Sequence, residues 1–144
     1  MLGFFQTATL RTEVPAPALI IAQHLTQIPL IRQWAWPQEY PTNILSLAPG
    51  LVFNSYLGPI AIGHRVNLCT ADQLELVLWG AADGFSRWAW GDGWLEQTTT
   101  AVTLIPLTLA QRQLVLNLAH FLGRSSLQKK RAPEDALFFP EIRR

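Results

Sequence analysis

The fold can be inferred most directly from residues 51–121, whose sequence is LVFNSYLGPI AIGHRVNLCT ADQLELVLWG AADGFSRWAW GDGWLEQTTT AVTLIPLTLA QRQLVLNLAH F. Turn dipeptides such as Gly58-Pro59 and Asp83-Gly84 separate short apolar segments at intervals of about 8–12 residues, as in an antiparallel meander. These segments contain four tryptophans, Trp79, Trp88, Trp90 and Trp94. An amphipathic helical segment then completes the stretch. The pattern predicts a curved antiparallel sheet around one helix, with an apolar space between them.

Alternation of apolar and polar residues predicts the strands and their faces. We expect strands at residues 4–12, 44–47, 51–57, 60–69, 74–79, 85–90 and 94–105. The clearest alternation places five residues on one face, namely Ile60, Ile62, His64, Val66 and Leu68. Keeping the charged residues outside gives an inward set of His64, Val66, Leu76, Leu78, Trp88, Trp90, Gln97 and Thr99. Trp79 then faces outward, and a bulge would invert the strand that contains it.

Two short helices are predicted between the first strand and the rest of the sheet. Residues 18–25 follow Pro15 and Pro17, and a proline is well tolerated in the first turn of a helix. Residues 28–36 form a second helical segment that ends at Pro37. This segment carries the two remaining tryptophans, Trp34 and Trp36.

The closing helix is the best-defined element of the sequence. Thr108 and Gln111 fit a capping box at its start. Its apolar face is formed by Leu114, Val115, Leu118, Phe121 and Leu122. Gly123 stands where a left-handed C-terminal cap belongs. We therefore expect one domain over residues 1–123 and a basic, flexible tail over residues 124–144.

Composition argues against nucleic acid as a partner. Apolar residues make up 49% of the chain and charged residues 15%. Residues 1–123 hold five basic and seven acidic side chains, whereas residues 124–144 hold six basic and three acidic ones. A nucleic-acid binder needs a basic face that displaces counterions, and the body of this chain has none.

Membrane insertion and disulfide formation are also not expected. The longest charge-free run, residues 14–31, is interrupted by Pro15, Pro17 and Pro29, whereas a spanning helix needs about 20 mostly apolar residues. Residues 1–13 lack the features of a signal peptide. Cys69 is the only cysteine, so no internal disulfide can form. The cytoplasm is the simplest location.

The order of elements resembles the START/Bet v 1-like helix-grip superfamily (SRPBCC). Residues 14–17 (VPAP) before a helix, residues 28–37 with Trp34 and Trp36 before Pro37, and residues 84–90 followed by a Thr-rich strand are similar to segments of that superfamily. The resemblance covers roughly residues 4–123 and implies an α+β helix-grip fold. Its bacterial members are often labelled polyketide cyclase/dehydrase or lipid-transport proteins.

Such a fold implies an apolar pocket between the sheet and the closing helix. The candidate lining residues are Trp34, Trp36, His64, Val66, Leu76, Leu78, Trp88, Trp90, Gln97, Thr99, Leu114, Leu118 and Phe121. His64 is the one titratable side chain on an otherwise apolar strand face, so it can orient a ligand carbonyl or act as an acid or base. Core packing is the competing interpretation for His64 and for the tryptophans.

Three functions remain open at this point. The first is a binding or carrier protein for a small hydrophobic ligand such as a lipid, isoprenoid or polyketide-like molecule. The second is a cyclase or dehydratase with His64 as acid/base and Gln97 or Thr99 positioning the substrate. The third is a protein-interaction module with a filled grip, acting through Trp34, Trp36 and the tail, which could also contact membrane surfaces weakly. We expect no metal and no cofactor, and an inert Cys69.

Overall fold

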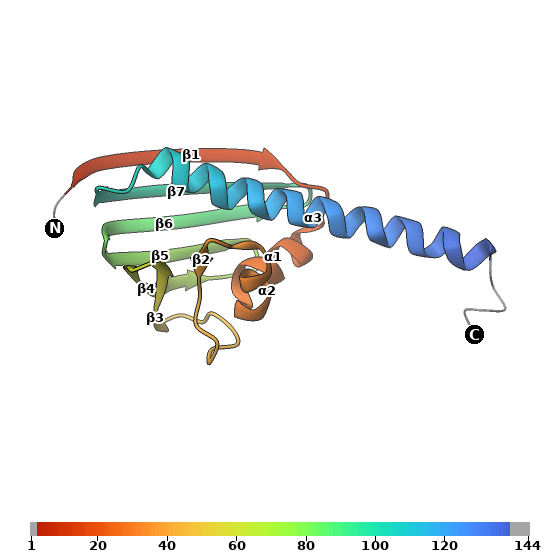
Figure 1. Cartoon of the computed structure of the whole chain (residues 1–144), viewed down its shortest axis with the longest axis horizontal. Helices are drawn as coiled ribbons and strands as arrows, with labels where there is room; N and C mark the ends of the chain where they lie inside the picture. The colour runs from red at the N-terminus through yellow and green to blue at the C-terminus, as the bar shows by residue number, and fades with distance from the viewer. Residues whose placement is uncertain (1–2, 139–144) are drawn as a thin grey trace.

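The protein folds into one curved antiparallel sheet with a long helix across its concave face (Figure 1). The structure is a computed structural model that describes the backbone of residues 3–138 and the side chains of residues 3–124. Its elements are β1 (Phe4–Glu13), α1 (Ala18–Thr26), α2 (Ile28–Trp34), β2 (Gln38–Glu39), β3 (Val52–Leu57), β4 (Ile60–Cys69), β5 (Gln73–Gly80), β6 (Ala82–Gly91), β7 (Trp94–Thr103) and α3 (Leu107–Phe138). This is the α+β helix-grip architecture that the sequence predicts.

The strand order is β1-β7-β6-β5-β4-β3-β2, so β1 lies beside the last strand rather than beside β2. Helices α1 and α2 pack on each other, α1 against β6 and α2 against α3. In Figure 1 they cover one end of the sheet, while α3 runs along it and extends beyond it. None of the described helices combines the length and apolarity required to cross a membrane.

The inward face of the sheet was predicted correctly from alternation. All eight residues of the inward set are buried, with at most 8% of their surface exposed. Arg87 and Glu75 pair outside, with 3.3 Å between Nη2 and Oε2. Trp79 also faces outward and lies over Gly63, where a β-carbon would meet the indole nitrogen. The concave face is therefore apolar and the convex face carries the charges.

The predicted strand at residues 44–47 is wrong. Backbone groups of this segment bond to the junction between α1 and α2 instead: Ile28 N–H donates to Leu45 O, and Leu47 N–H donates to Thr26 O. Only an isolated bridge between Gln27 and Ser46 results. At the edge of β3 that does not pair with β4, the partner is β2, two residues that follow the second helix.

A β-bulge corrects the assignment of Leu68. The register of β4 against β5 shifts between Val66 and Leu68, so that Leu68 pairs with the outward-facing Glu75. One extra residue in a strand turns every following side chain to the opposite face. Cys69 consequently lies on the inner side, paired with the buried Leu74. Burial raises the pKa of the Cys69 thiol.

Both predicted ends of the closing helix need correction. The capping box at Thr108 is not formed, because the helix begins at Leu107, whose N–H donates to Gln6 Oε1 at 3.1 Å. Nor does the helix end at Gly123; it continues to Phe138. A glycine inside a helix costs about 1 kcal/mol relative to alanine, which lowers stability without ending the helix. The division into a domain and a flexible tail stays a prediction.

Candidate ligand-binding site

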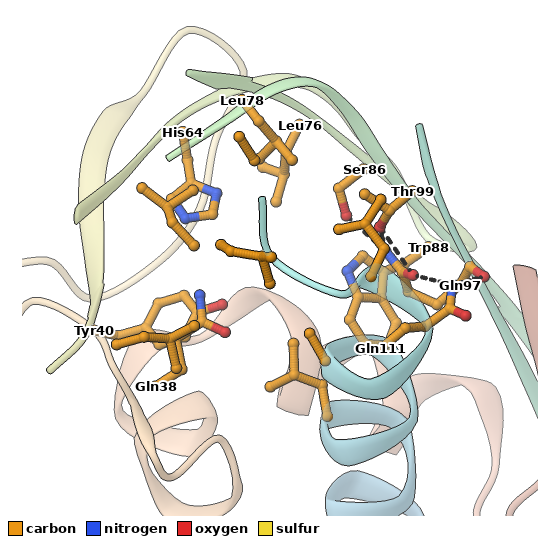
Figure 2. Close-up of a pocket in the computed structure, with 17 residues that line it drawn as sticks. Gln38, Tyr40, His64, Leu76, Leu78, Ser86, Trp88, Gln97, Thr99 and Gln111 are labelled. Atoms are coloured by element: carbon orange, nitrogen blue, oxygen red, sulfur yellow. Dashed lines mark hydrogen bonds between the residues drawn. The ribbon is translucent and has the colours of Figure 1, made fainter. Parts of the chain in front are cut away.

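A cavity of about 100 Å³ lies between the concave face of the sheet and the first turns of α3 (Figure 2). Its wall is formed by Gln38, Tyr40, Leu57, Ile62, His64, Leu76, Leu78, Ala82, Ser86, Trp88, Gln97, Thr99, Ile105, Leu107, Ala110, Gln111 and Leu114. None of these seventeen is an aspartate, glutamate, lysine or arginine. The cavity is therefore largely apolar, with a few polar groups at defined places.

Seven of the thirteen residues predicted for a pocket lie on this wall. They are His64, Leu76, Leu78, Trp88, Gln97, Thr99 and Leu114. Val66, Trp90 and Leu118 instead fill the core with at most 2% of their surface exposed. The sequence alone does not separate a wall position from a core position, because both are apolar and inward.

The remaining three predicted residues lie outside the cavity. Trp34 is buried at the end of α2, where its Nε1–H donates to His24 O at 2.9 Å and its ring meets Trp88 edge to face. Phe121 packs against the His24 ring, with 5.6 Å between the centroids. Trp36 is 76% exposed. Trp34 thus supports the cavity from behind Trp88, whereas Trp36 is a surface side chain.

His64 is held at one side of the cavity by a short chain of buried polar side chains. Gln38 Nε2–H donates to Ser55 Oγ at 2.7 Å, and Ser55 Oγ lies 2.8 Å from His64 Nε2. The imidazole stacks on Phe53 with 4.7 Å between centroids and an interplanar angle of 11°. All three polar residues are buried. The ring therefore has a fixed position and orientation.

The other ring nitrogen of His64 has no partner. Nδ1 is buried and makes no hydrogen bond within the described residues. Burial lowers the pKa of His64 to about 4, so the imidazole is neutral at pH 7. Burial likewise raises the pKa of the neighbouring Tyr40 to about 12. Neither titratable group on the wall is charged near neutral pH.

A second polar cluster lies on the opposite side of the cavity, as Figure 2 shows. Gln97 Nε2–H donates to Ser86 Oγ at 2.7 Å and to Thr99 Oγ1 at 2.8 Å. Gln111, from α3, donates through Nε2 to Gln97 Oε1 and to the backbone oxygens of Ala8 and Gln97, at 2.6, 2.8 and 2.8 Å. This cluster mostly satisfies itself and ties α3 to β1 and β7.

Five polar residues of the site were missed from sequence, namely Gln38, Tyr40, Ser55, Ser86 and Gln111. The position of Ser55 could have been inferred from the sequence. The Gly58-Pro59 turn sets the pairing of β3 with β4, which places Phe53 opposite His64. Ser55, two residues further along β3, then lies on the same face of the sheet as His64. The sequence pattern makes Gln111 a predicted capping residue, although its i+4 spacing to Val115 also places it on the buried face. Gln38 lies in β2, a strand of two residues that is too short for periodicity to indicate its direction.

We expect Gln111→Met to lower the free energy of unfolding by about 1–3 kcal/mol, because it leaves buried oxygens without their donor. The matched control is Gln113→Met on the same helix. Gln113 is exposed and donates only to Asn117 Oδ1 at 2.9 Å, so a change of about 0.5 kcal/mol or less is expected. Urea denaturation of both variants measures the difference; equal effects would refute the role given to Gln111.

The site contains a serine–histidine pair at hydrogen-bond distance, but the arrangement does not suit nucleophilic catalysis. Ser55 is fully buried behind His64 and is not part of the cavity wall. A nucleophile must reach the substrate, and its histidine is normally oriented by a third group. His64 Nδ1 has no such group. In the described part of the chain, no three His, Cys, Asp or Glu side chains gather to hold a metal ion.

Comparison with known proteins supports the fold. No protein-family model and no curated protein sequence matches the chain. Among solved structures, protein MLL2253 from Mesorhizobium loti matches with a TM-score of 0.68 and 16% identity, over 83% of this chain and 98% of that one. Protein CV1439 from Chromobacterium violaceum matches with 0.67 and 11%, over 81% and 96%.

A third match is the Aha1 dimer from Colwellia psychrerythraea, with a TM-score of 0.63 and 13% identity, over 82% of this chain and 96% of that one. Together with the topology, these matches confirm the resemblance to START/Bet v 1-like helix-grip proteins at the level of the fold. Identities this low say nothing about the ligand or the chemistry of the chain.

Proposed function

We propose that this protein binds a small, uncharged and largely apolar molecule between the sheet and α3, without transforming it. The observation that supports this function is the cavity wall, which combines apolar side chains with a few fixed polar groups and carries no charged residue. Small-molecule sites are usually concave and apolar, with polar groups that orient the ligand. A charged ligand would lose its hydration here without gaining a counter-charge.

The volume of the cavity suggests a compact ligand. An apolar cavity of about 150 Å³ takes up benzene, so the 100 Å³ found here suits a molecule of at most about six heavy atoms. A lipid, isoprenoid or polyketide-like molecule would need more room. That room would come from separating α3 from the segment around Gln38 and Tyr40, which faces it across the cavity.

The geometry supports binding better than it supports the cyclase or dehydratase alternative. A general acid or base works best with a pKa near the operating pH, whereas the pKa of His64 is lowered to about 4. Gln97 and Thr99, the residues suggested to position a substrate, are engaged with each other through two hydrogen bonds. The wall thus offers recognition and little acid–base chemistry.

The interaction-module alternative has one observation in its favour. Trp36 is 76% exposed, and Asn117 Nδ2–H donates to its backbone oxygen at 2.8 Å, which fixes it beside α3. The side chains of the tail after Arg124 lie outside the described residues. The helix-grip protein Aha1 was solved as a dimer, and a protein contact at Trp36 would be compatible with ligand binding in the grip.

Benzene titration followed by NMR tests the proposal. We expect saturable shifts of the methyl groups of Leu76, Leu78 and Leu114, which face the cavity. Ala110→Phe puts a ring into the cavity and should weaken binding at least tenfold. The control is Leu109→Phe at the next position of α3, where the side chain is 66% exposed and binding should stay unchanged. Benzene binding that is absent, or equal in both variants, would overturn the proposal.

A further inference from the structure

We infer that the Nδ1–H of His64 is the group that recognises the ligand, by donating a hydrogen bond to an acceptor oxygen such as a carbonyl, hydroxyl or ether. The inference rests on the proposed function and narrows its ligand class to uncharged molecules with an apolar body and one acceptor oxygen facing β4. It makes His64 a specificity-determining residue, with Ser55 and Gln38 as positioning residues.

The position of the proton follows from the direction of the hydrogen-bond chain. Gln38 Nε2 is a donor, so the Ser55 oxygen accepts from it. The single proton of the Ser55 hydroxyl then has one acceptor among the described contacts, His64 Nε2 at 2.8 Å. A neutral imidazole carries one proton, and with Nε2 accepting, that proton resides on Nδ1.

A buried donor without an acceptor is the strongest sign of a ligand in this cavity. More than 90% of buried polar groups have a hydrogen-bond partner, and an unpaired one costs free energy. His64 lies on the cavity wall with 4% of its surface exposed, and its Nδ1 is the buried side-chain atom without a partner among the described residues. Nδ1 itself is covered, so a ligand oxygen that moves aside the neighbouring side chains at this end of the cavity would supply the missing acceptor.

The opposite side of the cavity offers less to a ligand. The amide of Gln97 already bonds to Ser86, Thr99 and Gln111. The Ser86 hydroxyl accepts from Gln97, which leaves its own proton and the Nε1–H of Trp88 as the donors on this side. Leu76 and Leu78 of β5 separate Ser86 from His64, and two strand spacings amount to roughly 10 Å. A ligand of about six heavy atoms is too short to span this distance, so its oxygen can reach either His64 or Ser86, but not both.

Two probes of equal size separate this inference from the proposed function. Cyclopentanone has a carbonyl oxygen, and methylenecyclopentane has a CH₂ group in its place. We expect both to bind the wild-type protein, with cyclopentanone binding about tenfold more tightly because it satisfies the orphan donor. His64→Phe keeps a stacked ring over Phe53 without the donor, and the preference should disappear or reverse, because the buried carbonyl then loses its hydrogen bonds to water without replacement. Ser86→Ala should keep the preference.

The outcomes divide cleanly. If both probes bind the wild-type protein with equal affinity, or if His64→Phe keeps the preference, the inference is overturned while the proposed function stands. If Ser86→Ala removes the preference, the donor lies at the other end and the inference is also overturned. If neither probe binds, the proposed function and the inference that rests on it both fail.

A measurement on the free wild-type protein does not depend on any variant folding. Long-range ¹H–¹⁵N NMR distinguishes a protonated ring nitrogen from one with a free lone pair. At pH 7 we expect the His64 ring to show a protonated Nδ1 and an accepting Nε2, and cyclopentanone to shift Nδ1 more than Nε2. A spectrum with the proton on Nε2 would overturn the inference, because Nδ1 would then be an acceptor.

Discussion

Lowering the pH from 6.5 to 4 is expected to reduce the free energy of unfolding by about 3 kcal/mol more in the wild-type protein than in His64→Phe. Burial lowers the pKa of His64 from 6.5 to about 4 in the folded protein. Between these values the unfolded chain binds the proton and the folded chain does not, so stability falls as the pH falls. One unit of pKa difference corresponds to about 1.4 kcal/mol. Above pH 6.5 the two proteins should show the same pH dependence.

Urea denaturation at intervals between pH 4 and 8 measures this difference. The substitution leaves every carboxylate of the chain in place, and Tyr40 stays neutral throughout because its pKa is raised to about 12. The exposed His120 provides the control, since His120→Phe should keep the full wild-type slope. Parallel curves for wild type and His64→Phe would mean that His64 takes up its proton in the folded state as readily as in the unfolded chain.

Leu118→Ala should lower the free energy of unfolding by about 2–5 kcal/mol, the range for a leucine removed from a closed core. Leu118 is fully buried on the face of α3 that packs against the sheet, between the equally buried Val115 and Leu122. Truncation leaves a void in the layer that holds helix and sheet together. The cost reflects both the lost transfer free energy and the unfilled volume.

The comparison for this variant is Leu109→Ala on the same helix. Leu109 is 66% exposed, so its truncation removes little buried area and should change stability by about 0.5 kcal/mol or less. Thermal or urea denaturation at pH 7 measures both variants. Similar losses at the two positions would show that α3 does not pack on the sheet through the face described above.

Most of the fold could be predicted from the alternation of apolar and polar residues in the strands. The strand at residues 60–69 was predicted with the bounds of β4, because two turns delimit it and its side chains alternate. The failures have local physical causes. Residues 44–47 have the composition of a strand but bond to the α1–α2 junction, and a tertiary contact of this kind leaves no periodic pattern. The bulge before Leu68 shifts the register of β4 by one residue, and no residue type in the sequence indicates it.

The sequence predicted which side chains face the cavity, but not which hydrogen bonds the polar ones make. Alternation placed His64, Gln97 and Thr99 on the inner face, which follows from backbone geometry alone. Which of these side chains has a hydrogen-bond partner and which has none depends on distances between strands. It also depends on Gln38 from the short strand β2 and on Gln111 from α3. No pattern within a single segment can report such a meeting of distant residues.

The pairing of β1 with β7 has a consequence for how the chain acquires its structure. Phe4 pairs with Thr103 and Glu13 with Trp94, so this ladder joins the first strand of the sequence to the last one. Contacts of high sequence separation slow folding, because the loop between them must close before they form. During synthesis at roughly 5–20 residues per second, β1 has to wait several seconds for its partner. We therefore expect the β3–β6 meander to form first, with β1 and α3 added last.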